Sequence, residues 1–192
     1  YELTSGLKRL GIIDPVVFCP EDGPLRDLYQ RTGIEVIVRP HPLLGIFNVE
    51  QYHKAIDEFA RSILELEVDI VYGNTLQTFY AIDAASRAGI PSIWNPRESE
   101  PWQDYFSNFG DDIASHALSC FALPYRIVFV SDATRRGCEA INSTNNFVTI
   151  YNGLDPKRAK DESLMHPRAT SRDALDIKPD ELVVLLLGTV CA

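Results

Sequence analysis

Short apolar runs alternate with longer amphipathic segments along most of the chain. Each run holds about five apolar or β-branched residues between polar or turn-forming ones, which is typical of buried parallel strands. The pattern therefore predicts strands at Val16–Cys19, Ile34–Val38, Asp69–Tyr72, Ile90–Trp94, Ile127–Val130 and Phe147–Tyr151.

Helices are predicted between these strands, because apolar residues recur there at helical spacing. The clearest is Val49–Leu66, whose apolar residues line one face. Strands that alternate with helices predict an α/β fold, a Rossmann-like doubly wound and mostly parallel sheet with helices on both faces. The other predicted helices are Tyr1–Leu10, Leu25–Thr32, Leu76–Ala88, Trp102–Leu123 with a candidate break at Gly110, and about ten residues after a cap at Ser131 or Asp132.

The composition changes after Asp155. Residues 155–170 are charged and poor in apolar side chains, so they predict a linker. A short helix is predicted at Ser171–Leu175, and the apolar run Leu182–Leu187 predicts another strand. We therefore divide the chain into an N-terminal domain at 1–155, a linker at 156–180 and the first strand of a further domain at 181–192.

Charge and cysteine content narrow the class of protein. The net charge of −9 argues against a surface for nucleic acid or anionic membranes. No apolar run approaches the roughly 18 residues of a membrane span. The cysteines have no metal-binding spacing, and we interpret them as reduced thiols of a cytoplasmic protein with no metal site. They are Cys19, Cys120, Cys138 and Cys191.

Two stretches carry a resemblance to a known family. The sequence VFVSDATRR followed by VTIYNGLD resembles the end of the N-terminal domain of a retaining glycosyltransferase of the GT-B fold, group 1, family 4. Downstream, Arg172–Leu175 and DIKPDELVVLLLGTV resemble the start of the nucleotide-sugar domain of that family. Together these pieces place the resemblance over residues 69–190.

The resemblance implies a fragment of such an enzyme, one that lacks the first strand of its sheet and most of its second domain. A missing central strand would leave two unpaired edges, and we expect self-association of the chain to cover them. The implied activity is sugar transfer with retention, from a nucleotide-sugar donor to a sugar-containing acceptor such as a small molecule, a lipid-linked glycan or a polysaccharide. The family needs no metal or other cofactor. Peripheral attachment of the full-length protein to a membrane stays open.

Three polar loops follow predicted strands, and ligands of open α/β sheets bind beyond the carboxyl ends of the strands. The loops are 73–75, 95–100 and 131–136. Many family members have a histidine in the second loop, whereas this chain has Arg97 and Glu98 there. An arginine can clamp an anionic acceptor, and a glutamate can bind a sugar hydroxyl. The predicted acceptor-binding residues are Asn74, Thr75, Arg97, Glu98, Ser131 and Arg135.

Each of these residues also has a purely structural interpretation. Thr75 can cap the next helix. Arg97 and Glu98 can form an ordinary solvated ion pair, and Arg135 can be a solvated helix residue. Further along, the resemblance implies hinge roles for Asn152, Gly153 and Asp155, and donor-binding roles for Gly188 and Thr189.

Two other functions remain open from the sequence. The chain can be a non-catalytic Rossmann-like module that binds a sugar phosphate or a protein partner. A Rossmann-type oxidoreductase domain is the weaker alternative, because the chain has no glycine-rich dinucleotide fingerprint.

Overall fold

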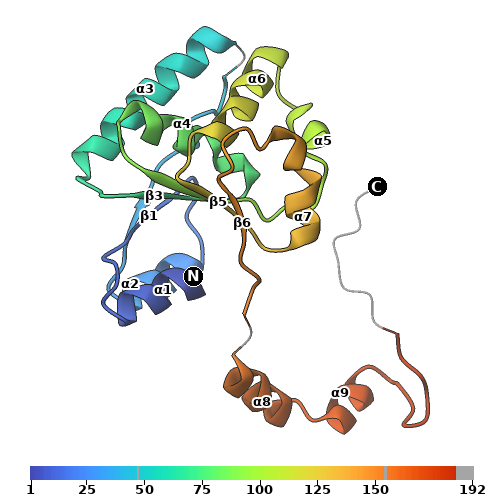
Figure 1. Cartoon of the computed structure of the whole chain (residues 1–192). Coiled ribbons are helices and arrows are strands. Elements are labelled where there is room, and N and C mark those ends of the chain that lie inside the picture. Colours follow the sequence, from blue (N-terminus) through green and yellow to red (C-terminus); the bar gives the residue numbers. More distant parts are fainter. Residues whose placement is uncertain (47, 154, 185–192) are drawn as a thin grey trace. The chain divides into compact units, whose positions relative to one another are not determined.

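The computed structural model describes residues 1–46, 48–153 and 155–184 (Figure 1). The backbone divides into two compact units, residues 1–151 and residues 152–192. We describe each unit by itself.

The first unit alternates strands and helices, as the hydrophobic pattern predicts (Figure 1). Its elements are α1 (Glu2–Arg9), β1 (Val16–Cys19), α2 (Leu25–Arg31), β2 (Glu35–Val38), α3 (Val49–Glu65), β3 (Val71–Asn74), η1 (Leu76–Thr78), α4 (Phe79–Arg87), β4 (Ser92–Asn95), α5 (Trp102–Phe106), α6 (Asp111–Ser119), η2 (Cys120–Ala122), β5 (Arg126–Phe129), α7 (Asp132–Gly137), η3 (Glu139–Ile141) and β6 (Phe147–Thr149).

All strand pairs in this unit are parallel, which confirms the Rossmann-like α/β fold. The strands form two sheets, one with the order β1-β2 and one with the order β3-β4-β5-β6. Within the part of the chain that the structure describes, β1, β2, β3 and β6 each pair on one side only. The expectation that a missing central strand leaves two unpaired edges stays a prediction, as does the self-association that would cover them.

The core lies against the larger sheet. One row of buried residues crosses all four strands in register, namely Gly73, Trp94, Ile127 and Phe147. The ring of Phe121 packs on Trp94 at 4.6 Å between centroids. Each fully buried large side chain of this kind contributes about 1.5–3 kcal/mol to stability, so this layer fixes the strands whose ends carry the predicted site.

Several predicted elements have different bounds in the structure. The strand predicted at Ile90–Trp94 is β4 at Ser92–Asn95, and the strand predicted at Phe147–Tyr151 ends at Thr149. The strand predicted at Asp69–Tyr72 is β3, two residues later, because its partner β4 begins only after Pro91, which has no N–H to donate. The helix predicted at 102–123 is broken into α5, α6 and η2, with Gly110 in extended backbone before α6. The helix of about ten residues predicted after Ser131 has six residues in α7.

The second unit contains α8 (Pro156–Met165) and α9 (Arg168–Ala174). Much of the segment predicted as a linker is therefore helical, and the short helix predicted at Ser171–Leu175 overlaps α9. Residues 182–184 have no strand structure, which corrects that part of the predicted strand Leu182–Leu187. The rest of this strand, with Gly188 and Thr189, lies outside the described residues.

Candidate functional site

The strands β3, β4 and β5 run parallel, so the three predicted loops follow them at the same edge of the larger sheet. Asn95 joins the strands there. Its amide oxygen accepts a hydrogen bond from the Tyr72 hydroxyl at 3.0 Å, and its amide nitrogen donates to the carbonyl oxygen of Val128. The Asn95 side chain is buried, and it links β4 to both neighbours. We call this edge, with loops 73–75, 95–100 and 131–136, the polar rim.

The turn after β3 is held in an unusual backbone conformation. Thr75 has φ 82° and ψ 159°, a region that is almost exclusive to glycine and costs about 1–3 kcal/mol for other residues. Its carbonyl oxygen accepts hydrogen bonds from the Trp94 indole at 2.8 Å and from the Thr78 hydroxyl at 2.9 Å. Its N–H donates to the Asn95 carbonyl oxygen at 2.9 Å. These contacts fix the direction in which Asn74 and Thr75 face the rim.

Glycine is required just before this turn. A Cβ atom on Gly73 would lie 2.7 Å from the Thr78 hydroxyl oxygen and 3.2 Å from Trp94 Cδ1. The absence of a side chain therefore lets the indole and α4 approach β3 closely.

Glu98 connects the first two loops. Its Oε2 atom accepts hydrogen bonds from the backbone N–H of Leu76 at 2.8 Å and of Arg97 at 2.9 Å. The Thr75 side chain makes no capping hydrogen bond, so the cap predicted for it is wrong, and Glu98 takes that place. Burial, with the nearby carboxylates of Glu98 and Glu100, raises the pKa of the Tyr105 phenol to about 12.

The residues of the third loop bind mainly to one another. The Ser131 hydroxyl accepts from the Thr134 N–H at 3.1 Å, which confirms Ser131 as the cap of α7. Arg135 pairs with Glu139 at 2.8 Å and lies 3.8 Å from Asp132. Both side chains are therefore already engaged within the protein.

Asp132 anchors the end of β6, which the sequence did not indicate. Its carboxylate accepts from the Thr149 hydroxyl at 2.6 Å and from the Tyr151 hydroxyl at 3.1 Å. These two bonds, helped by the charge of Arg135, hold the pKa of Asp132 below its usual value. These partners lie 17 and 19 residues from Asp132 in the sequence, so no local pattern points to the contacts.

A comparison with models of protein families matches residues 1–158 to glycosyltransferase family 4. The chain belongs to glycosyltransferase family 4. No curated protein matches it.

Solved structures share the fold of this family 4 chain. The structure of Anabaena Alr3699/HepE in complex with UDP matches at a TM-score of 0.53 and 18% identity over 84% of the chain. A second HepE structure, in complex with UDP and glucose, matches at a TM-score of 0.50 and 17% identity over 79% of the chain. A UDP-N-acetylglucosamine 2-epimerase from Listeria monocytogenes, described as putative, matches at a TM-score of 0.53 and 14% identity over 76% of the chain. The chain spans 42% of each HepE structure and 39% of the Listeria structure.

The residues predicted as a hinge in this family 4 chain follow directly after Tyr151. Asn152 and Gly153 are exposed, and the Asp155 carboxylate accepts from the Lys157 N–H at 2.9 Å. Their hinge role stays a prediction, as do the donor-binding roles of Gly188 and Thr189.

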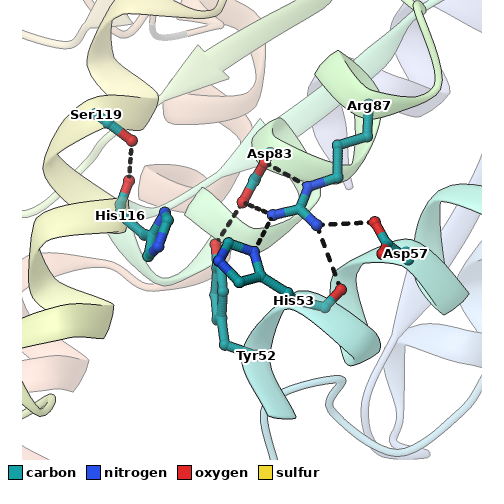
Figure 2. Close-up of polar contacts among 7 residues, drawn as sticks. All are labelled: Tyr52, His53, Asp57, Asp83, Arg87, His116 and Ser119. Atoms are coloured by element: carbon teal, nitrogen blue, oxygen red, sulfur yellow. Dashed lines mark hydrogen bonds and ion pairs between the residues drawn. The ribbon is translucent and has the colours of Figure 1, made fainter. Parts of the chain in front are cut away.

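A second polar cluster lies between α3, α4 and α6, and Figure 2 shows it. Arg87 donates to Asp83 at 3.0 Å, to Asp57 at 2.8 Å and contacts His53 Nδ1 at 2.8 Å. The Tyr52 hydroxyl donates to Asp83 at 2.8 Å. Since Arg87 uses its Nε and both terminal nitrogens, we interpret the cluster as a tie between helices and not as a ligand site.

Three further observations concern metal binding, membrane crossing and surface hollows. Within residues 1–46, 48–153 and 155–184, no group of three or more His, Cys, Asp or Glu side chains could hold a metal ion. No helix in these same ranges is long and apolar enough to cross a membrane. A shallow hollow of about 330 Å³ lies outside the polar rim and is lined by Asn48, Gly110, Asp111, Asp112 and Ile113.

Proposed function

We propose that the chain is the acceptor-side part of a glycosyltransferase that transfers a sugar from a nucleotide-sugar donor to a sugar-containing acceptor with retention. Membership of glycosyltransferase family 4 supports sugar transfer as the reaction class. The solved complexes of Anabaena HepE with UDP and glucose, which share the fold, support a nucleotide-sugar donor. One observation supports acceptor binding by this chain, namely that the polar rim lies at the carboxyl ends of β3, β4 and β5.

The predicted acceptor-binding residues of the rim divide into two groups by their exposure, since Asn74 and Arg97 are exposed and the others are half-buried. We assign Asn74 and Arg97 to direct contact with the acceptor. Thr75 contributes its hydroxyl in a direction that the strained backbone fixes. Ser131, Glu98 and Arg135 have partners within the protein, so we assign them first to holding the loops in place. Gly188 and Thr189 are assigned to the donor side, by resemblance alone.

In this mechanism the rim positions one acceptor hydroxyl for attack on the donor sugar. Positioning of this kind can supply a large part of the rate enhancement, because it removes translational and rotational freedom before the reaction. The departing nucleoside diphosphate needs cationic groups or helix N-termini for stabilisation. We do not assign stabilisation of the nucleoside diphosphate to the polar rim.

The test is a transfer assay on the full-length protein that contains this chain, with a panel of UDP- and GDP-sugars. Release of the nucleotide and the anomeric configuration of the product are measured by NMR. We expect transfer with retention from one of these donors and no turnover by residues 1–192 alone. Inversion of configuration, or no transfer from any donor, would contradict the proposal. The variant Asn74→Ala should lower transfer, and Asn108→Ala, an exposed asparagine outside the rim, should not.

A further inference from the structure

Two backbone N–H groups converge on one oxygen of Glu98. They belong to Leu76 and Arg97, at 2.8 Å and 2.9 Å from Oε2. Convergent backbone N–H groups are a usual means by which proteins bind phosphate and carboxylate groups of ligands. Here a side chain of the protein itself occupies them, so an incoming anion finds both donors taken.

The charges around this point disfavour anions further. The loop from Asn95 to Glu100 carries one cation, Arg97, and two carboxylates, Glu98 and Glu100. Burial and, after it, the charges of both carboxylates raise the pKa of the Tyr105 phenol, so both charges lie near that ring. In the neighbouring loop, Arg135 is neutralised by Glu139 at 2.8 Å. Asp132 and the exposed Arg136 there carry opposite charges, so the negative excess lies in loop 95–100.

We propose that Glu98 makes this part of the polar rim reject phosphate- and carboxylate-bearing groups, so that the acceptor group bound beside Asn74 and Thr75 is an uncharged hydroxyl. A phosphate here would have to displace the Glu98 carboxylate or lie against a like charge in a partly buried loop. A sugar hydroxyl has no such conflict, since the amide of Asn74 and the hydroxyl of Thr75 both donate and accept. The identity of the ligand as an acceptor rests on the proposed function, whereas the exclusion of anions is measurable without turnover.

The test is a titration of inorganic phosphate into the nitrogen-15-labelled chain at pH 7, followed through the backbone amide resonances of Leu76 and Arg97. In the wild-type chain we expect no saturable shift of these resonances. In Glu98→Ala both N–H groups lose their acceptor and one negative charge disappears. We therefore expect a saturable shift, with an affinity for phosphate at least roughly tenfold higher than in the wild type.

Two further variants complete the design. Glu98→Gln keeps an oxygen that can accept from both N–H groups but removes the charge, so it should retain the turn and bind phosphate with intermediate affinity. Glu65→Gln removes one charge from the exposed end of α3, and it should behave like the wild type. The amide spectra also report whether each variant is folded. If Glu98→Ala does not fold, the titration of Glu98→Gln tests the proposal in its place.

Three results would overturn the proposal. They are a saturable phosphate shift at Leu76 in the wild-type chain, no gain of phosphate binding in a folded Glu98 variant, and an equal gain in Glu65→Gln. A failure of the transfer assay leaves these outcomes unaffected, so the two proposals fail separately.

Discussion

The indole N–H of Trp94 donates a hydrogen bond to the carbonyl oxygen of Thr75 at 2.8 Å, and this bond joins the end of β4 to the strained turn after β3. The variant Trp94→Phe keeps an aromatic ring in the core but removes the donor. Because the indole is fully buried, we expect the free energy of unfolding to fall by about 1–3 kcal/mol, from the lost bond and the smaller ring. Urea denaturation followed by circular dichroism measures this change.

Trp102 provides the matched control for this variant. Its indole nitrogen is buried and has no hydrogen-bond partner in the described part of the chain. Trp102→Phe therefore removes similar ring volume without breaking a bond, and it should cost clearly less. Equal losses in the two variants would mean that the bond to Thr75 contributes nothing.

The backbone of Thr75 leads to a prediction of opposite sign. Thr75→Gly should relieve about 1–3 kcal/mol of strain, against about 0.5–1 kcal/mol for the greater freedom of glycine in the unfolded chain. We therefore expect a net rise in the free energy of unfolding of about 1 kcal/mol, measured by the same denaturation.

The control for that change is Thr144→Gly, in an exposed loop where the threonine φ is not positive. It should lower stability slightly, since no strain is relieved there. If Thr75→Gly destabilises as Thr144→Gly does, the turn is not strained.

Much of the fold follows from local pattern. The alternation of apolar runs and amphipathic segments predicted the parallel strands and helices such as the one that the structure shows at Val49–Glu65. Both patterns are visible in the sequence because one face of each element is buried. The placement of β3 was wrong by two residues, since the register of a strand depends on its partner. The partner of β3 is β4, and Pro91, which lies more than fifteen residues after β3 in the sequence, sets where β4 can begin to pair.

The candidate site was predictable in position but less so in its contacts. The rule for ligand loops after parallel strands selected segments 73–75, 95–100 and 131–136, and the structure brings these to one edge. Glu98 caps the N–H of Leu76 from 22 residues away in the sequence, so no local pattern indicates this contact. Thr75, the residue next to Leu76, was therefore the cap that the sequence predicted. Contacts between loops depend on the assembled sheet, which a linear pattern does not contain.

Asp132 should make the stability of the first unit sensitive to acid. Hydrogen bonds from Thr149 and Tyr151, with the charge of Arg135, hold its pKa below the ordinary value of 3.8 in the folded chain. A carboxyl with a lowered pKa contributes stability that is fully present above the unfolded-state pKa and is lost as pH falls through the folded-state value. We therefore expect stability to decrease from about pH 5 downward, and less steeply in Asp132→Asn.

The measurement is the free energy of unfolding at a series of pH values from neutral to acid. The control is Asp180→Asn, which removes one exposed carboxylate of the second unit. A pH profile of Asp132→Asn that is parallel to the wild-type profile would argue against a role for the Thr149 and Tyr151 bonds.

The cluster in Figure 2 gives the last prediction, about the packing of α3 on α4. Arg87 and Asp83 have side chains only 24% and 13% exposed, and Tyr52 donates to the same carboxylate. Arg87→Ala leaves Asp83 largely buried without its cation, so we expect a loss of about 2–3 kcal/mol, somewhat below the range for fully buried pairs. Arg87→Lys should recover part of it, because lysine restores the charge but not the forked geometry. Arg26→Ala is the control, since its pair with Asp22 is 40% and 57% exposed and should matter little. If thermal denaturation gives equal losses for the two alanine variants, Arg87 does not tie the helices together.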